Sequence, residues 1–197
     1  FDGDIAGAFI WRLGEALIAR GHGVTVIAPA DRGETGGELL GKVRVRRVRY
    51  AAAARETLAY QGTLHHLASS PMGVIAFARM VRALSRAVGE EVRASSANVI
   101  HAHWWIPGAL ATKMAERAGR PWVVTVHGTD VALARKLPGG LAVMGAVLRP
   151  ASTVTAVSSF LAADVARALG VSAATIPLTP MPLALGRGAD PDATRHG

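Results

Sequence analysis

The sequence predicts an α/β fold in which a parallel sheet carries helices on both faces. Segments with apolar residues at helical spacing alternate along the chain with short apolar segments. The short segments are apolar throughout, as strands covered on both faces must be. A regular succession of strand and helix favours a parallel sheet. The predicted architecture is therefore Rossmann-like.

The first predicted element is an amphipathic helix over residues 5–20, where apolar residues recur at helical spacing. Gly21 ends it, because glycine accepts the left-handed backbone that closes many helices. A buried strand rich in β-branched residues follows over 24–28. Since such a helix should follow a strand, we expect the first strand of the sheet to lie before Phe1.

The next part of the chain is expected to be less regular. Residues 31–41 predict a glycine-rich loop, 43–50 a second strand, and 51–70 a mobile loop with one short helix. A long helix opens at Ser70-Pro71, with serine as its cap and proline in its first turn. The remaining predicted elements are strands over 98–102, 122–126, 153–157 and 174–178, and helices over 107–118, 141–148 and 160–169.

Composition limits the chemistry open to this chain. None of the 197 residues is cysteine, which excludes disulfides and thiolate metal sites. No apolar run reaches the roughly 18 residues of a membrane-spanning helix. The net charge of +8 favours anionic partners such as phosphates, nucleotides and acidic headgroups. Nucleic acid is not expected, because no aromatic residues interleave the arginines at 44–49 as a stacking platform requires.

Ligands of an open parallel sheet bind at the carboxyl ends of its strands. That rule selects four loops, at residues 1–7, 103–107, 127–131 and 158–159. The first precedes a helix amino terminus, whose free N–H groups suit a phosphate, and Gly3 would let the backbone approach closely. It contains neither the G-x-G-x-x-G motif of dinucleotide-binding enzymes nor a Walker loop.

The other three loops carry polar and aromatic residues. His127 can hydrogen-bond a sugar hydroxyl or a phosphate oxygen, and Asp130 can cap the next segment or orient the imidazole. His103 is expected to point into the cleft. Trp104 can stack on a sugar or lipid-linked acceptor, or fill a contact between domains. Ser158 is expected to cap the following helix, which is compatible with phosphate contact.

A histidine-dependent metallohydrolase is the least favoured hypothesis. His101 and His103 would share one face of a strand, and His127 would join them. No further ligand lies at a recognisable spacing, so we expect no metal site. His101 is instead expected to be packed or hydrogen-bonded.

Four motifs, in this order, resemble those of family-four glycosyltransferases, and together they span nearly the whole chain. They lie at residues 11–26, 99–104, 125–130 and 154–158, and include His101-Ala102-His103-Trp104 and His127-Gly128-Thr129-Asp130. The resemblance implies an enzyme of the GT-B type, in which two Rossmann-like domains face each other across a cleft. Such enzymes transfer a sugar from a nucleoside-diphosphate sugar with retention of configuration, generally without a metal or other cofactor.

In that resemblance the chain corresponds to the amino-terminal, acceptor-side domain. Residues 1–180 would form this domain, and 181–197 would lead into a second domain that holds the nucleotide and the family's glutamate pair. The acceptor would be a glycan, a lipid or a small molecule. We expect a cytoplasmic protein, and contact with the acidic inner face of a membrane is compatible with its charge.

The resemblance also assigns roles by position. His127 would reach the donor sugar as the catalytic residue. Many members have paired glycines where this chain has Gly3-Asp4; the Asp4 carboxylate would repel a diphosphate, so an acceptor hydroxyl is the role assigned to it. The donor phosphates are assigned to Gly3, Thr129 and Ser158, and the acceptor to Asp4, His103, Trp104 and Asp130.

One alternative needs no catalysis. A Rossmann-like module could bind an anionic ligand or a membrane surface through its basic segment, Arg44, Arg46, Arg47 and Arg49. The same segment could equally be a solvated strand face.

Overall fold

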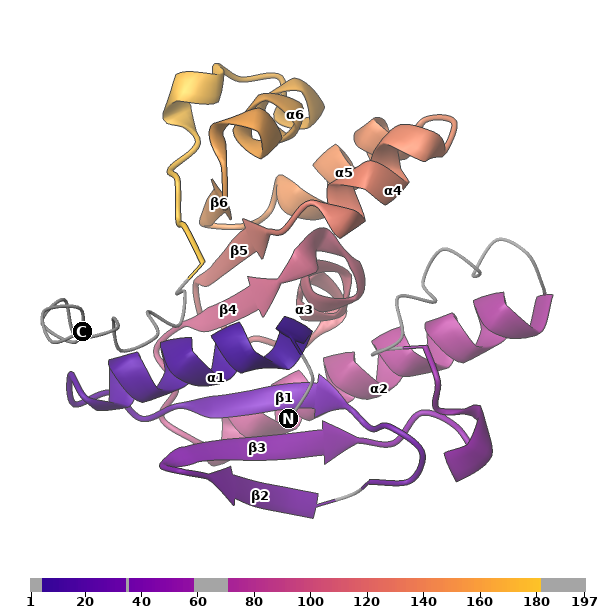
Figure 1. The fold of residues 1–197 in the computed structure, drawn as a ribbon, viewed down its shortest axis with the longest axis vertical. Coiled ribbons are helices and arrows are strands. Elements are labelled where there is room, and N and C mark those ends of the chain that lie inside the picture. Colours follow the sequence, from indigo (N-terminus) through magenta and orange to yellow (C-terminus); the bar gives the residue numbers. More distant parts are fainter. Residues whose placement is uncertain (1–4, 35, 59–70, 182–197) are drawn as a thin grey trace, which may run out of the picture.

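A computed structural model describes residues 5–34, 36–58 and 71–181 and contains two three-stranded sheets (Figure 1). The first has the order β1-β3-β2, and its strands are β1 (Thr25–Pro29), β2 (Gly36–Leu40) and β3 (Val43–Val48). The second has the order β4-β5-β6, and its strands are β4 (Ile100–His103), β5 (Trp122–Val126) and β6 (Thr153–Ala156). All pairs are parallel except β2 with β3.

Helices connect the strands, as the sequence predicts. The α-helices are α1 (Ile5–Ile18), α2 (Pro71–Ala94), α3 (Leu110–Met114), α4 (Thr129–Lys136), α5 (Gly140–Leu148) and α6 (Ser159–Leu169). Other helical turns are η1 (Ala53–Arg55), η3 (Trp104–Ala109) and η4 (Ala173–Thr175). Within the described residues, no helix is both long and apolar enough to cross a bilayer.

The main core surrounds β5, the central strand of the second sheet. Trp122, Val124 and Val126 of β5 are buried and belong to one cluster with residues of β6, α5 and α6, among them Met144 and Val165. A second cluster joins the end of β3 to α2 and α3. Apolar strands between helices are thus confirmed, and they bring the carboxyl ends of β4, β5 and β6 to one edge of their sheet.

The prediction of a loop over residues 31–41 is wrong in part, because residues 36–40 form the strand β2. This strand pairs antiparallel with β3 through the two-residue turn Gly41-Lys42, where Gly41 has a φ of 60°. The Trp11 indole also donates a hydrogen bond of 3.2 Å to the carbonyl of Leu40. The strand is therefore stabilised by its neighbours more than by its own glycine-rich sequence.

The prediction of a strand over residues 174–178 is also wrong. Residues 173–175 form the turn η4, and a single bridge pairs Ala156 with Leu178. Ser172 caps the turn by accepting a hydrogen bond from the backbone N–H of Ala174. Pro177 lacks an N–H and cannot donate to a ladder, so the pairing does not extend.

Candidate functional site

The two histidines predicted to face the cleft meet at the carboxyl ends of neighbouring strands. His103 is the last residue of β4, and His127 comes directly after β5. Because these strands are parallel and adjacent, the two rings come together: His103 Nδ1 lies 2.9 Å from His127 Nε2. One nitrogen donates in this hydrogen bond and the other accepts, so the two tautomers are linked.

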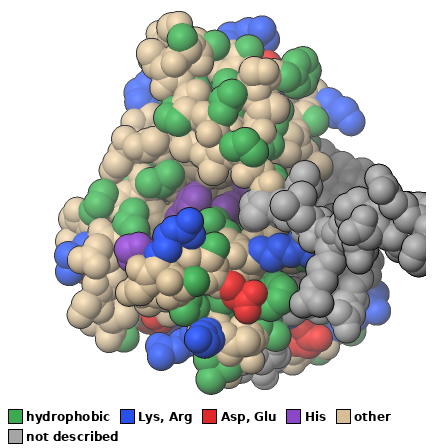
Figure 2. Space-filling model, turned by 60° about the vertical axis from the view of Figure 1, so that its left-hand side comes forward, with side chains coloured by type: hydrophobic (Ala, Val, Ile, Leu, Met, Phe, Trp, Pro, Cys, Tyr) green, Lys and Arg blue, Asp and Glu red, His purple; other side chains and the backbone are tan. Residues whose placement is uncertain are grey.

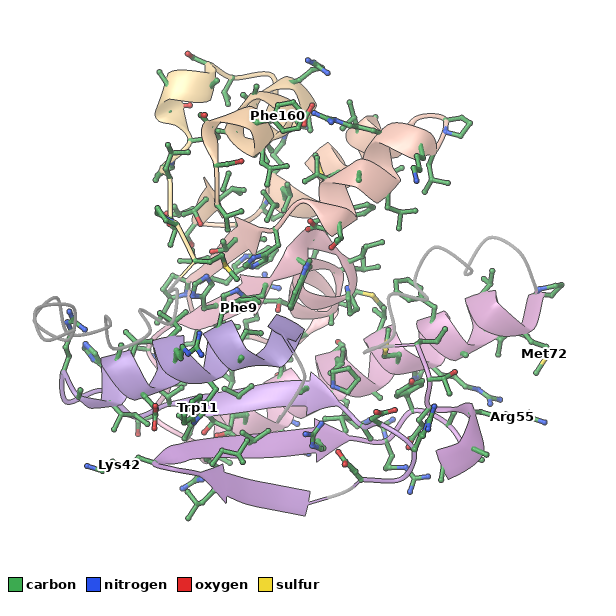
Figure 3. All side chains as sticks on the ribbon, viewed as in Figure 1. Phe9, Trp11, Lys42, Arg55, Met72 and Phe160 are labelled. Atoms are coloured by element: carbon green, nitrogen blue, oxygen red, sulfur yellow. The ribbon has the colours of Figure 1, made fainter. Side chains whose placement is uncertain are left out.

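Phe9 and Trp104 pack against the two histidines. We call these four residues, Phe9, His103, Trp104 and His127, the aromatic cluster. The Phe9 ring lies 4.9 Å from the His127 ring and 5.7 Å from the His103 ring, measured between centroids. Trp104 lies 4.8 Å from His127. Figure 3 shows Phe9 at the start of α1, on the side toward β4 and β5. In Figure 2, histidine side chains reach the surface near the middle of the face shown.

Both histidines of the pair are neutral at physiological pH. Burial is the main cause, and it lowers the pKa of His103 to about 2, helped by repulsion from His101 and His127. Burial likewise lowers the pKa of His127 to about 4, helped by His101. The pair therefore offers hydrogen bonds and no positive charge.

One buried ring nitrogen of this pair has no hydrogen-bond partner among the described residues. His127 Nδ1 is buried, and no described residue forms a hydrogen bond with it. A buried polar atom without a partner costs about 1–3 kcal/mol, so such atoms are rare unless a ligand or water satisfies them. Depending on the tautomer, Nδ1 can accept from a hydroxyl or donate to an oxygen.

His101 is hydrogen-bonded, as the sequence predicts. Its Nε2 lies 2.7 Å from the Thr125 hydroxyl, which in turn lies 2.8 Å from the Thr155 hydroxyl. Its ring stacks on His103 with centroids 4.3 Å apart. This row of polar groups runs across β4, β5 and β6, and its His101 ring packs against His103.

Within the described part of the chain, the three histidines are not arranged as a metal site. His103 and His127 are in direct hydrogen-bond contact, which leaves no space for an ion between the bonded nitrogens. Among the residues that the structure describes, no group of three or more histidine, cysteine or carboxylate side chains has the arrangement that a metal ion needs.

The Asp130 carboxylate is only 5% exposed and faces inward. Oδ2 accepts a 2.8 Å hydrogen bond from the backbone N–H of Trp105, and Oδ1 accepts from those of His127 and Gly128. Burial raises the pKa of Asp130, and these backbone hydrogen bonds oppose that shift. Asp130 thus ties together the loops that follow β4 and β5, while its contact with an acceptor remains a prediction.

The loop after β4 depends on a close backbone approach that the sequence did not reveal. A Cβ atom at Gly108 would lie 2.1 Å from the carbonyl oxygen of His103. Trp104, between them, has a φ of 62°, a left-handed conformation that is unfavourable for a residue with a side chain. The sequence did not identify Phe9 as a site residue either, because it looked like one more apolar position on the first helix.

Two of the predicted phosphate contacts, Thr129 and Ser158, lie at helix amino termini on the same edge. Ser158 caps α6, as predicted, because its hydroxyl accepts a 3.4 Å hydrogen bond from the backbone N–H of Leu161. Thr129 is exposed and is the first residue of α4. Their contact with a phosphate stays a prediction. Gly3 and Asp4 lie outside the described residues.

The basic segment of β3 is largely neutralised within the chain. Arg46 pairs with Glu90, Arg47 lies 3.3 Å from Glu34, and Arg49 lies 2.6 Å from Glu56. Because carboxylates already occupy these three arginines, the segment offers less charge to an anionic surface than the sequence implies. This weakens the non-catalytic alternative.

Comparisons with known proteins agree with this fold. The model of the glycosyl transferase 4-like domain matches residues 6–182. Among solved structures, a sucrose-phosphate synthase from Thermosynechococcus elongatus has a similar fold, with a TM-score of 0.57 and 18% sequence identity. The similarity covers 90% of this chain and 85% of that chain. No curated protein matches the sequence at a significant level.

Proposed function

The chain belongs to the glycosyl transferase 4-like family, and from this membership we propose a specific form of glycosyl transfer. The donor is a nucleoside-diphosphate sugar, the acceptor is a glycan, a lipid or a small molecule, and the configuration at the transferred carbon is retained. Residues 1–180 are the acceptor-side domain, and 181–197 lead into a second domain that completes the donor site. Without that second domain, the acceptor-side domain is inactive.

The partnerless nitrogen of His127 is the observation that supports this proposal most. A nitrogen that is buried yet has no described partner, at the carboxyl edge of a parallel sheet, is matched to a ligand. In the proposal, His127 Nδ1 forms a hydrogen bond with the donor sugar as the catalytic contact, and His103 fixes the His127 tautomer. Because the ring is neutral, it orients the sugar and carries no charge to the diphosphate.

The charge of the departing diphosphate must then be stabilised elsewhere. The amino termini of α4 and α6 carry partial positive charge and free N–H groups, which suit a phosphate. We assign the donor phosphates to Thr129, Ser158 and Gly3, together with groups of the second domain. No metal or other cofactor enters this scheme, and preorganised dipoles supply the electrostatic stabilisation.

The acceptor side is formed by the other members of the site. Trp104 offers an aromatic face on which a sugar ring can stack, and Asp4 offers a carboxylate for an acceptor hydroxyl. Asp130 acts through the backbone of the two loops, so we assign it a positioning role alongside the predicted acceptor contact.

A donor screen tests the proposal. The complete enzyme, with its second domain, is incubated with a panel of nucleoside-diphosphate sugars and candidate acceptors, in the presence of a metal chelator. We expect release of the nucleoside diphosphate with one donor, and a product whose anomeric proton shows the donor's configuration by NMR. An inverted product would contradict retention, and strict dependence on added metal would contradict the metal-free scheme.

A further inference from the structure

A groove where α2 meets the turn after α3 lies apart from the candidate site. All but one of its lining residues recur on α2 every three or four positions, and so share one stripe of the helix. The remaining residue follows α3. The cavity measures about 270 Å³, and its lining residues are Arg82, Ser85, Arg86, Gly89, Arg93 and Glu116.

The groove carries more positive charge than the chain neutralises. Arg82 and Arg86 are exposed, and neither forms a hydrogen bond or ion pair with a described residue. Arg93 forms a 2.8 Å ion pair with Glu116. Glu90, the next carboxylate along the helix, is paired with Arg46, and its pKa is lowered first by that pairing and to a lesser extent by the nearby charges of Arg86 and Arg93. Like charges four residues apart destabilise a helix, so Arg82 and Arg86 would be stabilised by a bound anion.

A glycine inside the helix keeps the floor of the groove open. A Cβ atom at Gly89 would lie 3.4 Å from the carbonyl oxygen of Glu116 and 3.5 Å from an Arg93 guanidinium nitrogen. Glycine in a helix interior is unfavourable compared with alanine. At this position it leaves space between α2 and the turn after α3, where the guanidinium groups gather.

We propose that this groove binds a phosphate-bearing anion. The planar guanidinium group presents paired N–H donors that match phosphate oxygens, and Ser85 adds a hydroxyl donor. A free phosphate compound and a phospholipid headgroup offer the same chemistry. The groove is not part of the sugar-transfer site, because Glu116 precedes the amino end of β5 whereas His127 follows its carboxyl end. The five residues of that strand alone span roughly 16 Å.

NMR of the full chain tests the site directly. Inorganic phosphate is titrated at low salt while the amide signals of Ser85 and Gly89 are followed in the wild type, in Arg82→Gln/Arg86→Gln and in the control Arg79→Gln. Arg79 is exposed on the same helix but does not line the groove. We expect both signals to shift in the wild type and the control, and the affinity to fall at least about tenfold in the double variant.

Signals that stay unmoved in the wild type, or that move equally in the double variant, would overturn the proposal. Each variant changes only exposed side chains, and the double variant also removes a like-charge pair, so neither should lower the thermal unfolding midpoint. Ligands at the candidate site do not confuse the test, since the reporting amides lie in the groove itself.

Vesicle flotation identifies the source of the phosphate. Binding to phosphatidylglycerol vesicles, but not to phosphatidylcholine vesicles, that is lost only in the double variant supports the groove and assigns it a lipid headgroup. Phosphate-dependent NMR shifts without vesicle binding support the groove and assign it a soluble phosphate compound. Vesicle binding lost equally in Arg79→Gln would mean diffuse attraction to the helix and would count against the groove.

Discussion

The two histidines of the aromatic cluster are neutral at physiological pH and can act only through hydrogen bonds. Their pKa values of about 2 and about 4 lie below the ordinary value of 6.5, mainly because the half-buried rings are partly withdrawn from water. At neutral pH each ring has one donor and one acceptor, and the hydrogen bond between them uses one nitrogen of each. Activity that depends on His127 should therefore not follow a histidine titration near pH 6.5.

The pH dependence of the free energy of unfolding should report the same lowered pKa of His127. The unfolded chain protonates His127 near pH 6.5, whereas the folded chain resists protonation until about pH 4. The contribution of this group to the free energy of unfolding is thus fully present above pH 6.5 and declines as the pH falls toward 4. Urea unfolding between pH 7.5 and 4.5 should show a smaller decline in His127→Gln than in the wild type, because glutamine does not titrate. Equal declines would contradict a buried neutral ring.

Asp130 gives a second prediction for a single side chain. Asp130→Ala would leave the backbone N–H groups of Trp105, His127 and Gly128 without their acceptor. Since each buried orphan costs about 1–3 kcal/mol, we expect a loss of about 3 kcal/mol in the free energy of unfolding. Chemical denaturation measures this loss. A variant as stable as the wild type would show that these hydrogen bonds do not hold the two loops together.

At the scale of elements, the loop from β4 into α3 depends on the glycine at its end. Gly108→Ala places a Cβ 2.1 Å from the His103 carbonyl, so the end of β4 must move. We expect a loss of about 1–3 kcal/mol in stability. Gly23→Ala is the matched control, because a Cβ there meets nothing within 4 Å. Thermal unfolding compares the two, and similar midpoints would refute the close approach.

The elements show what local sequence can and cannot predict. Apolar strands such as β5 are predictable because burial on both faces leaves a direct mark on composition. β2 escapes prediction because its stability comes from pairing with β3, which lies outside the local sequence. α4 escapes it because the helix is short and begins within two residues of the site histidine, where a ligand-binding loop is expected.

The sequence likewise predicts some features of the candidate site and misses others. The carboxyl-end rule brings His103 and His127 together in advance, because it depends only on the order of strands. The rule does not show which way a side chain faces, so it does not distinguish the inward carboxylate of Asp130 from a ligand contact. Nor does it reveal packing from a distant helix, which is how Phe9 joins the cluster.

In the whole molecule, the histidine pair and the arginine groove lie toward opposite ends of the β4-β5-β6 sheet. The carboxyl edge of β4, β5 and β6 holds the neutral histidine pair and the amino termini of α4 and α6. The arginine groove lies toward the amino end of β5. In the two proposals, an anion bound to α2 would therefore not reach the transferred sugar, and sugar transfer and anion binding would use separate regions of the fold.

The turnover of His127→Ala tests the central claim, that the histidine pair forms part of a sugar-transfer site. The measurement compares kcat/KM of the complete enzyme in the wild type, in His127→Ala and in His22→Ala, whose histidine is exposed and lies after α1. Losing a preorganised hydrogen bond in the transition state should lower kcat/KM about 100-fold in His127→Ala and leave His22→Ala unchanged. Wild-type turnover in a folded His127→Ala enzyme would contradict the account.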